Sequence, residues 1–337
     1  MRHAPPLLES PELKPGRARL EAGLVAAMEE NHWIAVAAEW DLWEITCGDR
    51  QGTALLSDHW FVIDFPPGRG RPRRPIRLLA QNAQLPGNAK HVLDGGSVRI
   101  RAEIPLDEPG AQDSDELEAL VRQSVLGVSR ALAADEINVP PKARLDSSAA
   151  SPVAEQRASP ARLCAAAGWS FSERSGGRIS VDLDVADNAY HKADVEQCPG
   201  GIRISVNPNR GDPAVETTSR QAVAALMLSG SGSVRMVSAI SRRSNGKPAT
   251  GHDTLFRVEL PSTTSSSTFA HSLSALSVAC DVCAREVRAL AEDPGLARAF
   301  LQACHPSALP SPKPRGRPMR AATQDEVDGV TDPGTIP

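Results

Sequence analysis

The chain has 337 residues, 41% hydrophobic and 23% charged, which is long enough for two soluble domains with separate cores. Its 37 Lys and Arg against 41 Asp and Glu argue against bulk attraction to nucleic acid or to an anionic membrane. No apolar run approaches the length that crosses a bilayer, and the proline-rich start lacks the apolar stretch of a signal peptide. Together with six cysteines in no regular framework, this predicts a cytoplasmic protein with reduced thiols and no membrane contact.

The first half of the chain predicts a helix, three strands, a second helix, a hairpin of two strands and a long third helix. Leu20, Leu24 and Met28 recur at helical spacing in the first helix, and Trp33 follows where that helix should end. The predicted helices span residues 17–31, 76–83 and 113–134, and the predicted strands span 43–47, 53–56, 60–65, 90–93 and 98–105. In the last of these strands apolar residues alternate with Arg99, Arg101 and Glu103, which predicts one buried face and one solvated face.

The second half repeats this order. Its first helix starts at Ser159-Pro160, a cap followed by proline, and ends before Trp169, the expected counterpart of Trp33. Further helices are predicted for residues 217–228, 268–292 and 296–303, and strands for 178–185, 190–196, 201–206, 234–240 and 254–261. Gly230 to Ser233 follow a predicted helix instead of opening one, and no Lys-Ser/Thr pair follows them, so we interpret them as a helix stop and not as a phosphate-binding loop.

The sequence of one predicted strand is repeated in the second half of the chain. Arg101-Ala102-Glu103-Ile104-Pro105 returns as Arg257-Val258-Glu259-Leu260-Pro261, 156 positions later (257 − 101). A repeat of this length predicts two copies of one domain. The predicted fold is therefore α+β, with two tandem units that each form an antiparallel sheet covered by helices. The predicted divisions are a disordered arm at 1–16, units at 17–142 and 159–304, a linker at 143–158 and a disordered tail at 305–337.

This order of elements resembles the type III secretion chaperone-like fold, which bacterial sensory-transduction-regulator-like proteins share. The word Glu-(Ile/Leu)-Pro at the end of the final strand, before a long leucine-bearing helix, carries the resemblance over residues 17–136 and 160–292. The resemblance implies no catalytic motif, and it implies a homodimer that binds extended segments of client proteins. This chain departs from it by holding two domains.

Residues with possible chemistry do not form a convincing site in the sequence. Cys280 and Cys283, with Cys304 and His305, are the nearest approach to a zinc site, but the first pair lies inside a predicted helix, so we interpret both as helix-face residues. On the strand at 190–196 and just beyond it, Asp194, Glu196 and Cys198 share one face while His191 points the other way, which is typical of a solvated strand. Glu103 and Glu259 are each expected to face solvent beside a cross-strand arginine. We therefore predict no enzyme activity, no metal and no cofactor.

Two arginine-rich segments resemble the core of an AT-hook. Arg315-Gly316-Arg317 lies in the predicted tail, and Arg69-Gly70-Arg71 lies in a proline-rich loop. Arg-Gly-Arg is thin enough to lie in the narrow A·T minor groove. Against this, acidic residues balance the cations of the tail, and the motif is short enough to arise by chance.

The sequence favours a non-enzymatic protein-binding protein. In this hypothesis the two units pack as an intramolecular pseudo-dimer, and a segment of an unidentified protein partner adds along a sheet edge or lies between helices. The alternative is association with A·T-rich DNA through the Arg-Gly-Arg segments. A structural role in a larger assembly stays open as a third possibility.

Overall fold

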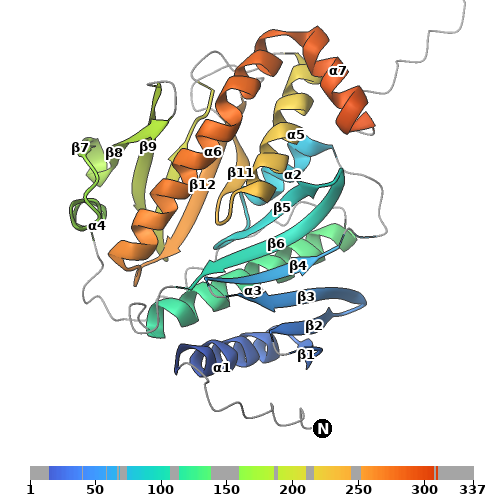
Figure 1. The fold of residues 1–337 in the computed structure, drawn as a ribbon, viewed down its shortest axis with the longest axis vertical. Helices are drawn as coiled ribbons and strands as arrows, with labels where there is room; N and C mark the ends of the chain where they lie inside the picture. The colour runs from blue at the N-terminus through green and yellow to red at the C-terminus, as the bar shows by residue number, and fades with distance from the viewer. Residues whose placement is uncertain are drawn as a thin grey trace, which may run out of the picture.

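The computed structural model describes residues 15–39, 41–57, 59–66, 68, 74–106, 114–137, 159–185, 189–209, 216–243, 252–306 and 309. The predicted linker, and nearly all of the predicted arm and tail, lie outside these residues. The described part of the chain forms seven α-helices and two six-stranded antiparallel sheets, each covered by helices (Figure 1). The predicted α+β fold with two similar units is confirmed. None of the described helices is long and apolar enough to span a membrane.

The first unit contains sheet A, with strand order β1-β2-β3-β4-β6-β5. Its helices are α1 (Pro15–Glu30), α2 (Pro75–Asn82) and α3 (Ser114–Ile137). Its strands are β1 (Trp33–Ala37), β2 (Leu42–Cys47), β3 (Arg50–Leu56), β4 (Trp60–Phe65), β5 (Ala89–Asp94) and β6 (Ser97–Pro105).

The second unit contains sheet B, with the corresponding order β7-β8-β9-β10-β12-β11. Its helices are α4 (Pro160–Ala166), α5 (Thr217–Ser233), α6 (Ser266–Glu292) and α7 (Pro294–Cys304). Its strands are β7 (Phe171–Glu173), β8 (Ile179–Val185), β9 (Ala189–Cys198), β10 (Gly201–Val206), β11 (Ser238–Arg243) and β12 (His252–Pro261), with a short 3-10 turn at Ser175–Gly177. The side chain of Ser159 caps α4 by accepting from Arg162 N, as the Ser-Pro pair predicts.

Each sheet has one strand more than the five predicted, because β1 and β7 were not recognised. Trp33 of β1 is buried while Ile34 and Val36 are exposed, an alternation too short to stand out in the sequence. The three residues of β7 are all exposed, so they carry no periodic signal. Both strands lie at the outer edge of their sheet.

The two cores differ in composition. In the first unit aromatic pairs pack edge to face, Trp33 with Phe65 at 5.5 Å and Trp43 with Phe61 at 6.2 Å between ring centroids. The second core is mostly aliphatic, and it includes Leu78 and Leu79, which come from α2 of the first unit. The two units therefore share hydrophobic core, and α2 packs on β11 while α5 packs on β5.

Helix α5 ends at Ser233, within the predicted stop, although it continues past the predicted end at residue 228 and includes Gly230 and Gly232. These glycines allow close approach. A Cβ at Gly230 would collide with the Sγ of Cys283 on α6, and a Cβ at Gly232 would lie 3.3 Å from Leu93 O on β5. The pair of glycines lets α5 fit between α6 and sheet A.

Candidate functional site

The repeated arginines, Arg101 on β6 and Arg257 on β12, each bind the end of a helix from the other unit. Arg101 Nη1 donates to Gly232 O in the last turn of α5, at 3.1 Å. Arg257 donates to three carbonyl oxygens at the end of α2, those of Asn82 (2.7 Å), Ala83 (2.9 Å) and Leu85 (3.2 Å). The last carbonyl groups of a helix have no partner within the helix and carry its negative dipole end, so a guanidinium is well suited to them.

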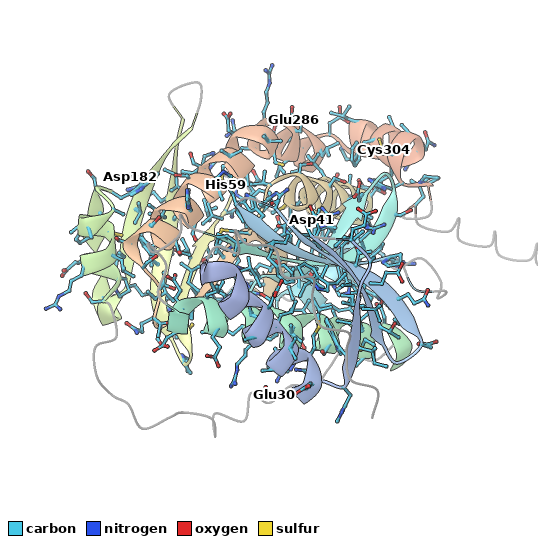
Figure 2. All side chains as sticks on the ribbon, turned by 60° about the horizontal axis from the view of Figure 1, so that its bottom comes forward. Glu30, Asp41, His59, Asp182, Glu286 and Cys304 are labelled. Atoms are coloured by element: carbon cyan, nitrogen blue, oxygen red, sulfur yellow. The ribbon has the colours of Figure 1, made fainter. Side chains whose placement is uncertain are left out.

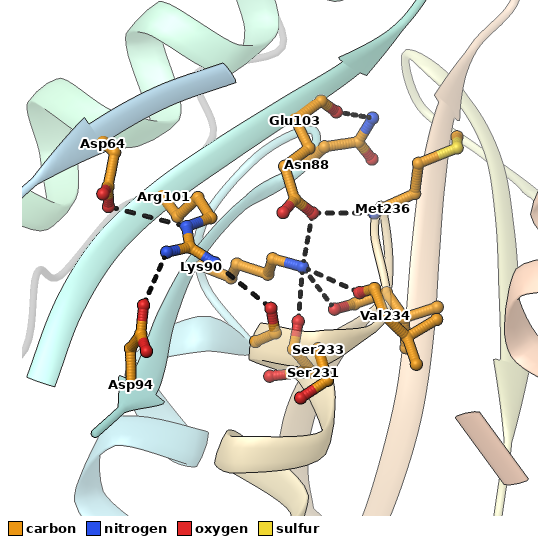
Figure 3. A network of polar contacts seen from close by, with 12 residues as sticks. Asp64, Asn88, Lys90, Asp94, Arg101, Glu103, Ser231, Ser233, Val234 and Met236 are labelled. Carbon is orange, nitrogen blue, oxygen red and sulfur yellow. Dashed lines mark hydrogen bonds and ion pairs between the residues drawn. The ribbon is translucent and has the colours of Figure 1, made fainter. Parts of the chain in front are cut away.

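Lys90 on β5 joins sheet A to the end of α5 (Figure 3). Its side chain is fully buried. Its Nζ lies 2.7 Å from Glu103 Oε2 and donates to the carbonyl oxygens of Ser231 (2.6 Å), Val237 (3.0 Å) and Val234 (3.2 Å). Burial lowers the pKa of Lys90 below its usual value, and the Glu103 carboxylate opposes that shift.

Glu103 is buried, so the prediction that it faces solvent was wrong. Its Oε2 also accepts from the backbone N of Met236 at 2.9 Å, and Met236 adopts the left-handed conformation with φ of 65°. The loop that follows α5 covers this face of β6, which the strand pattern alone assigns to solvent. Its counterpart Glu259 is part-buried and pairs with Arg203 at 3.0 Å and Arg257 at 3.3 Å.

Asn82, the last residue of α2, connects the two inner edge strands. Its Nδ2 donates to His91 O on β5 and to Ala239 O on β11, both at 3.0 Å. His91 and Ala239 are equivalent, because they pair with Ile100 and Phe256, which are separated by the offset of the repeat. The Oδ1 of Asn82 accepts from His91 N at 2.7 Å and lies 2.9 Å from its Nδ1. We name the network of Asn82, Lys90, Arg101, Glu103 and Arg257 the junction.

Docking of the two units covers one edge of each sheet and leaves the other edge open. The inner edges, β5 and β11, lie against each other and against α5 and α2. The outer edges are β1 in sheet A and β7 in sheet B, each hydrogen-bonded to a strand on one side only. An edge strand offers unpaired backbone groups to another strand, so β1 and β7 are the candidate binding edges.

The two outer edges differ in how they are protected. β7 has three residues, contains Glu173 and is followed by Arg174, and short charged edges resist pairing. β1 has five residues, Trp-Ile-Ala-Val-Ala, with no charge and no proline. Its Ile34 and Val36 are 63% and 54% exposed. β1 is thus the unprotected edge of the described structure.

The open face of sheet A that carries Ile34 and Val36 also carries an apolar row on β2, β3 and β4, next to the exposed Glu44. Register places Val36 opposite Glu44 on β2, Leu42 opposite Leu55 on β3, and Leu55 opposite Val62 on β4. Opposite residues of an antiparallel pair share a face of the sheet. Leu55 is 43% exposed and Leu42 and Val62 are half-buried. An added strand at β1 would extend this apolar face.

The cysteines and the β9 residues lie where the sequence suggested. Cys280 and Cys283 are buried on α6, whereas Cys304 is exposed on α7 (Figure 2). Burial raises the pKa of the Cys283 thiol to about 12 and that of Cys164 to about 11. His191 is buried, and Asp194 and Glu196 form ion pairs with arginines on the opposite face of sheet B. Among the described residues no group of His, Cys, Asp and Glu side chains converges as a metal site.

The candidate DNA-binding residues, Arg69, Gly70, Arg71, Arg315, Gly316 and Arg317, lie outside the described residues. Sequence reasoning missed Lys90, Asn82 and the β1 edge. The sequence contained a signal for Lys90, because it lies opposite the repeated Arg101 in the predicted hairpin. It also contained a signal for β1, which is an uncharged run of five residues between a helix and a turn.

No family model, curated protein or solved structure matches this chain. The resemblance to the type III secretion chaperone-like fold stays a prediction.

Proposed function

We propose that this is a non-enzymatic protein-binding protein that takes up an extended protein segment at the β1 edge. The observation that carries the proposal is the unprotected β1 strand, with Ile34 and Val36 exposed on one face. Main-chain hydrogen bonds along a free edge provide affinity, and alternate side chains of the added strand provide specificity. An exposed apolar edge strand is a template for pairing with a strand of another chain.

We also propose that the two units act as an intramolecular pseudo-dimer. The reciprocal contacts of Arg101 with α5 and of Arg257 with α2 support this, because equivalent residues make equivalent contacts as they do about a twofold axis. The second unit would then serve to hold the first: its α5 covers one end of the sheet A face and leaves the β1 end free. The junction groups are bound to one another and to backbone carbonyls, which supports a structural role for them.

The test of segment binding is selection from a displayed library of random peptides about twelve residues long, long enough to pair along β1. The full chain should enrich peptides with alternating apolar residues. A Val36→Lys variant should lose them, because a lysine on an edge strand opposes pairing. The matched control is Phe171→Lys on β7, which should keep them. Enrichment of no peptide by the folded wild-type chain would contradict the proposal.

Association with A·T-rich DNA stays the second candidate, and the Arg-Gly-Arg segments of the sequence favour it. It would be tested by a salt titration of binding to an A·T-rich duplex, with the intact chain beside a variant that ends at Pro306. Equal binding by both proteins would remove the tail from consideration.

A further inference from the structure

The surroundings of β1 are acidic. Exposed carboxylates precede it, follow it and lie beside it: Glu29, Glu30, Glu39, Asp41 and Glu44. Figure 2 labels Glu30, at the end of α1 just before β1, and Asp41, in the turn after it. Among the described cations, Arg122 lies 3.4 Å from Glu30 and offsets the charge of that carboxylate, and Arg50 lies 3.7 Å from Asp135. A segment that approaches this edge therefore meets a negative field.

This charge argues against a second copy of the chain as the occupant. In an antiparallel pair of two β1 strands about a twofold axis, the start of one strand lies beside the end of the other. Glu29 and Glu30 of one copy would then approach Glu39 and Asp41 of the other. Like charges set opposite each other across strands are destabilising. The acidic ends of β1 favour a partner of opposite charge.

We infer that the β1 edge binds an extended segment of a partner protein in which apolar and basic residues alternate. The inference rests on the proposed function and names the chemistry of its partner. The apolar side chains of the segment lie on the sheet A face beside Ile34 and Val36, and its basic residues, which alternate with them, approach the carboxylates at the two ends of β1, Glu29, Glu30, Glu39 and Asp41. Charge attraction speeds the encounter and excludes acidic segments, while the backbone pairing holds the strand.

Two synthetic peptides test this inference, one that alternates lysine with valine and one that alternates glutamate with valine. Each is labelled with a fluorophore and titrated with the full chain by anisotropy. At about 0.02 M salt the lysine peptide should bind at least about tenfold more tightly than the glutamate peptide, and about 0.5 M salt should reduce this difference. A lysine peptide with alternate backbone amides methylated should lose binding, because it cannot pair along the edge.

Matched variants place the binding on β1. Ile34→Lys should weaken the lysine peptide about tenfold, and Phe171→Lys on β7 should leave it within about twofold. Both side chains are on the surface, and a urea unfolding curve verifies that the variants are folded. Val36→Lys is the second variant if Ile34→Lys unfolds.

Three results would overturn the inference. Equal affinity for the two peptides would remove the preference for basic residues, and if both still require Ile34, the proposed segment binding stands without it. Unchanged affinity in both β1 variants would place the site elsewhere. A concentration-dependent dimer that Ile34→Lys abolishes, measured by sedimentation, would make a second copy the occupant. If neither peptide binds and the displayed library also enriches nothing, the proposed function fails as well.

Discussion

Lys90 Nζ lies 2.7 Å from Glu103 Oε2 on the neighbouring strand of sheet A, and the end of α5 from the second unit buries both side chains. Taking two charges out of water costs free energy that their attraction repays only with good geometry and further hydrogen bonds. Here both are present, because the ammonium also reaches three carbonyl groups and the carboxylate accepts from Met236 N. The pair therefore serves to align the units more than to add stability.

Replacing Lys90 by methionine should lower the free energy of unfolding by about 3–5 kcal/mol, because it leaves the Glu103 carboxylate buried without a counter-charge. Urea unfolding measures the change. The double variant Lys90→Met/Glu103→Leu should regain part of the loss, since it removes the unpaired charge. Lys192→Met is the matched control, because that side chain is 64% exposed and lies 3.9 Å from Asp182. A loss in Lys90→Met no greater than in the control would contradict the role of the pair.

Replacing Arg257 by methionine should loosen α2, although the two belong to different units. The change leaves the carbonyl groups at the end of α2 without their donor. Amide hydrogen exchange in residues 75–82 should accelerate by about tenfold or more. Arg203→Met, in the same sheet, should leave α2 unchanged, because Arg203 pairs with Glu196 and Glu259 within the second unit. Equal exchange in both variants would show that Arg257 does not hold α2.

Gly230→Ala should destabilise the protein by about 1–3 kcal/mol, because the added methyl group collides with Cys283 Sγ. Adding Cys283→Ala should recover part of that loss, which thermal unfolding can measure. Gly23 of α1 has open space around its Cβ position, so Gly23→Ala should instead stabilise by about 0.4–1 kcal/mol. If Gly230→Ala were the more stable of the two variants, α5 and α6 would not be in close contact at Gly230.

Alkaline pH should destabilise the protein through its buried thiols. The folded-state pKa values of Cys164 and Cys283, about 11 and about 12, exceed the usual thiol pKa of 9.0, because burial disfavours the thiolate. Between these values the unfolded chain has released protons that the folded chain still holds, so the free energy of unfolding falls as pH rises above about 9. The slope is at most about 1.4 kcal/mol per pH unit for each thiol. The variant Cys164→Ala/Cys283→Ala should show a smaller decline in urea unfolding measured from neutral to alkaline pH, with the remainder due in part to Cys198, whose pKa burial also raises. An identical pH profile would show that the thiols are accessible to solvent.

Strand β6 shows which structural properties could be predicted from the sequence and which could not. The alternation from Val98 to Ile104 predicted the strand and its apolar face, and both are confirmed, because a period of two follows directly from backbone geometry. The same alternation assigned Glu103 to solvent. It could not show that the end of α5 and the loop after it cover that face, because Gly232 is 131 residues from Arg101 and Met236 is 133 residues from Glu103.

The candidate binding edge β1 could not be predicted from the sequence either. The sequence contained the uncharged run of β1, but a strand becomes an edge only when its neighbours are known. Sheet order placed β5 and β11 inside the molecule and left β1 outside.

The sequence by itself determined that this protein has two similar α+β units, because periodicity, turn residues and the repeated Arg-x-Glu-(Ile/Leu)-Pro word are local properties. The tertiary structure alone decided that this word lies at the junction, that Glu103 is buried and that β1 is free. Those outcomes depend on how α2 and α5 dock across the units, and such long-range packing leaves no period in the sequence of either partner.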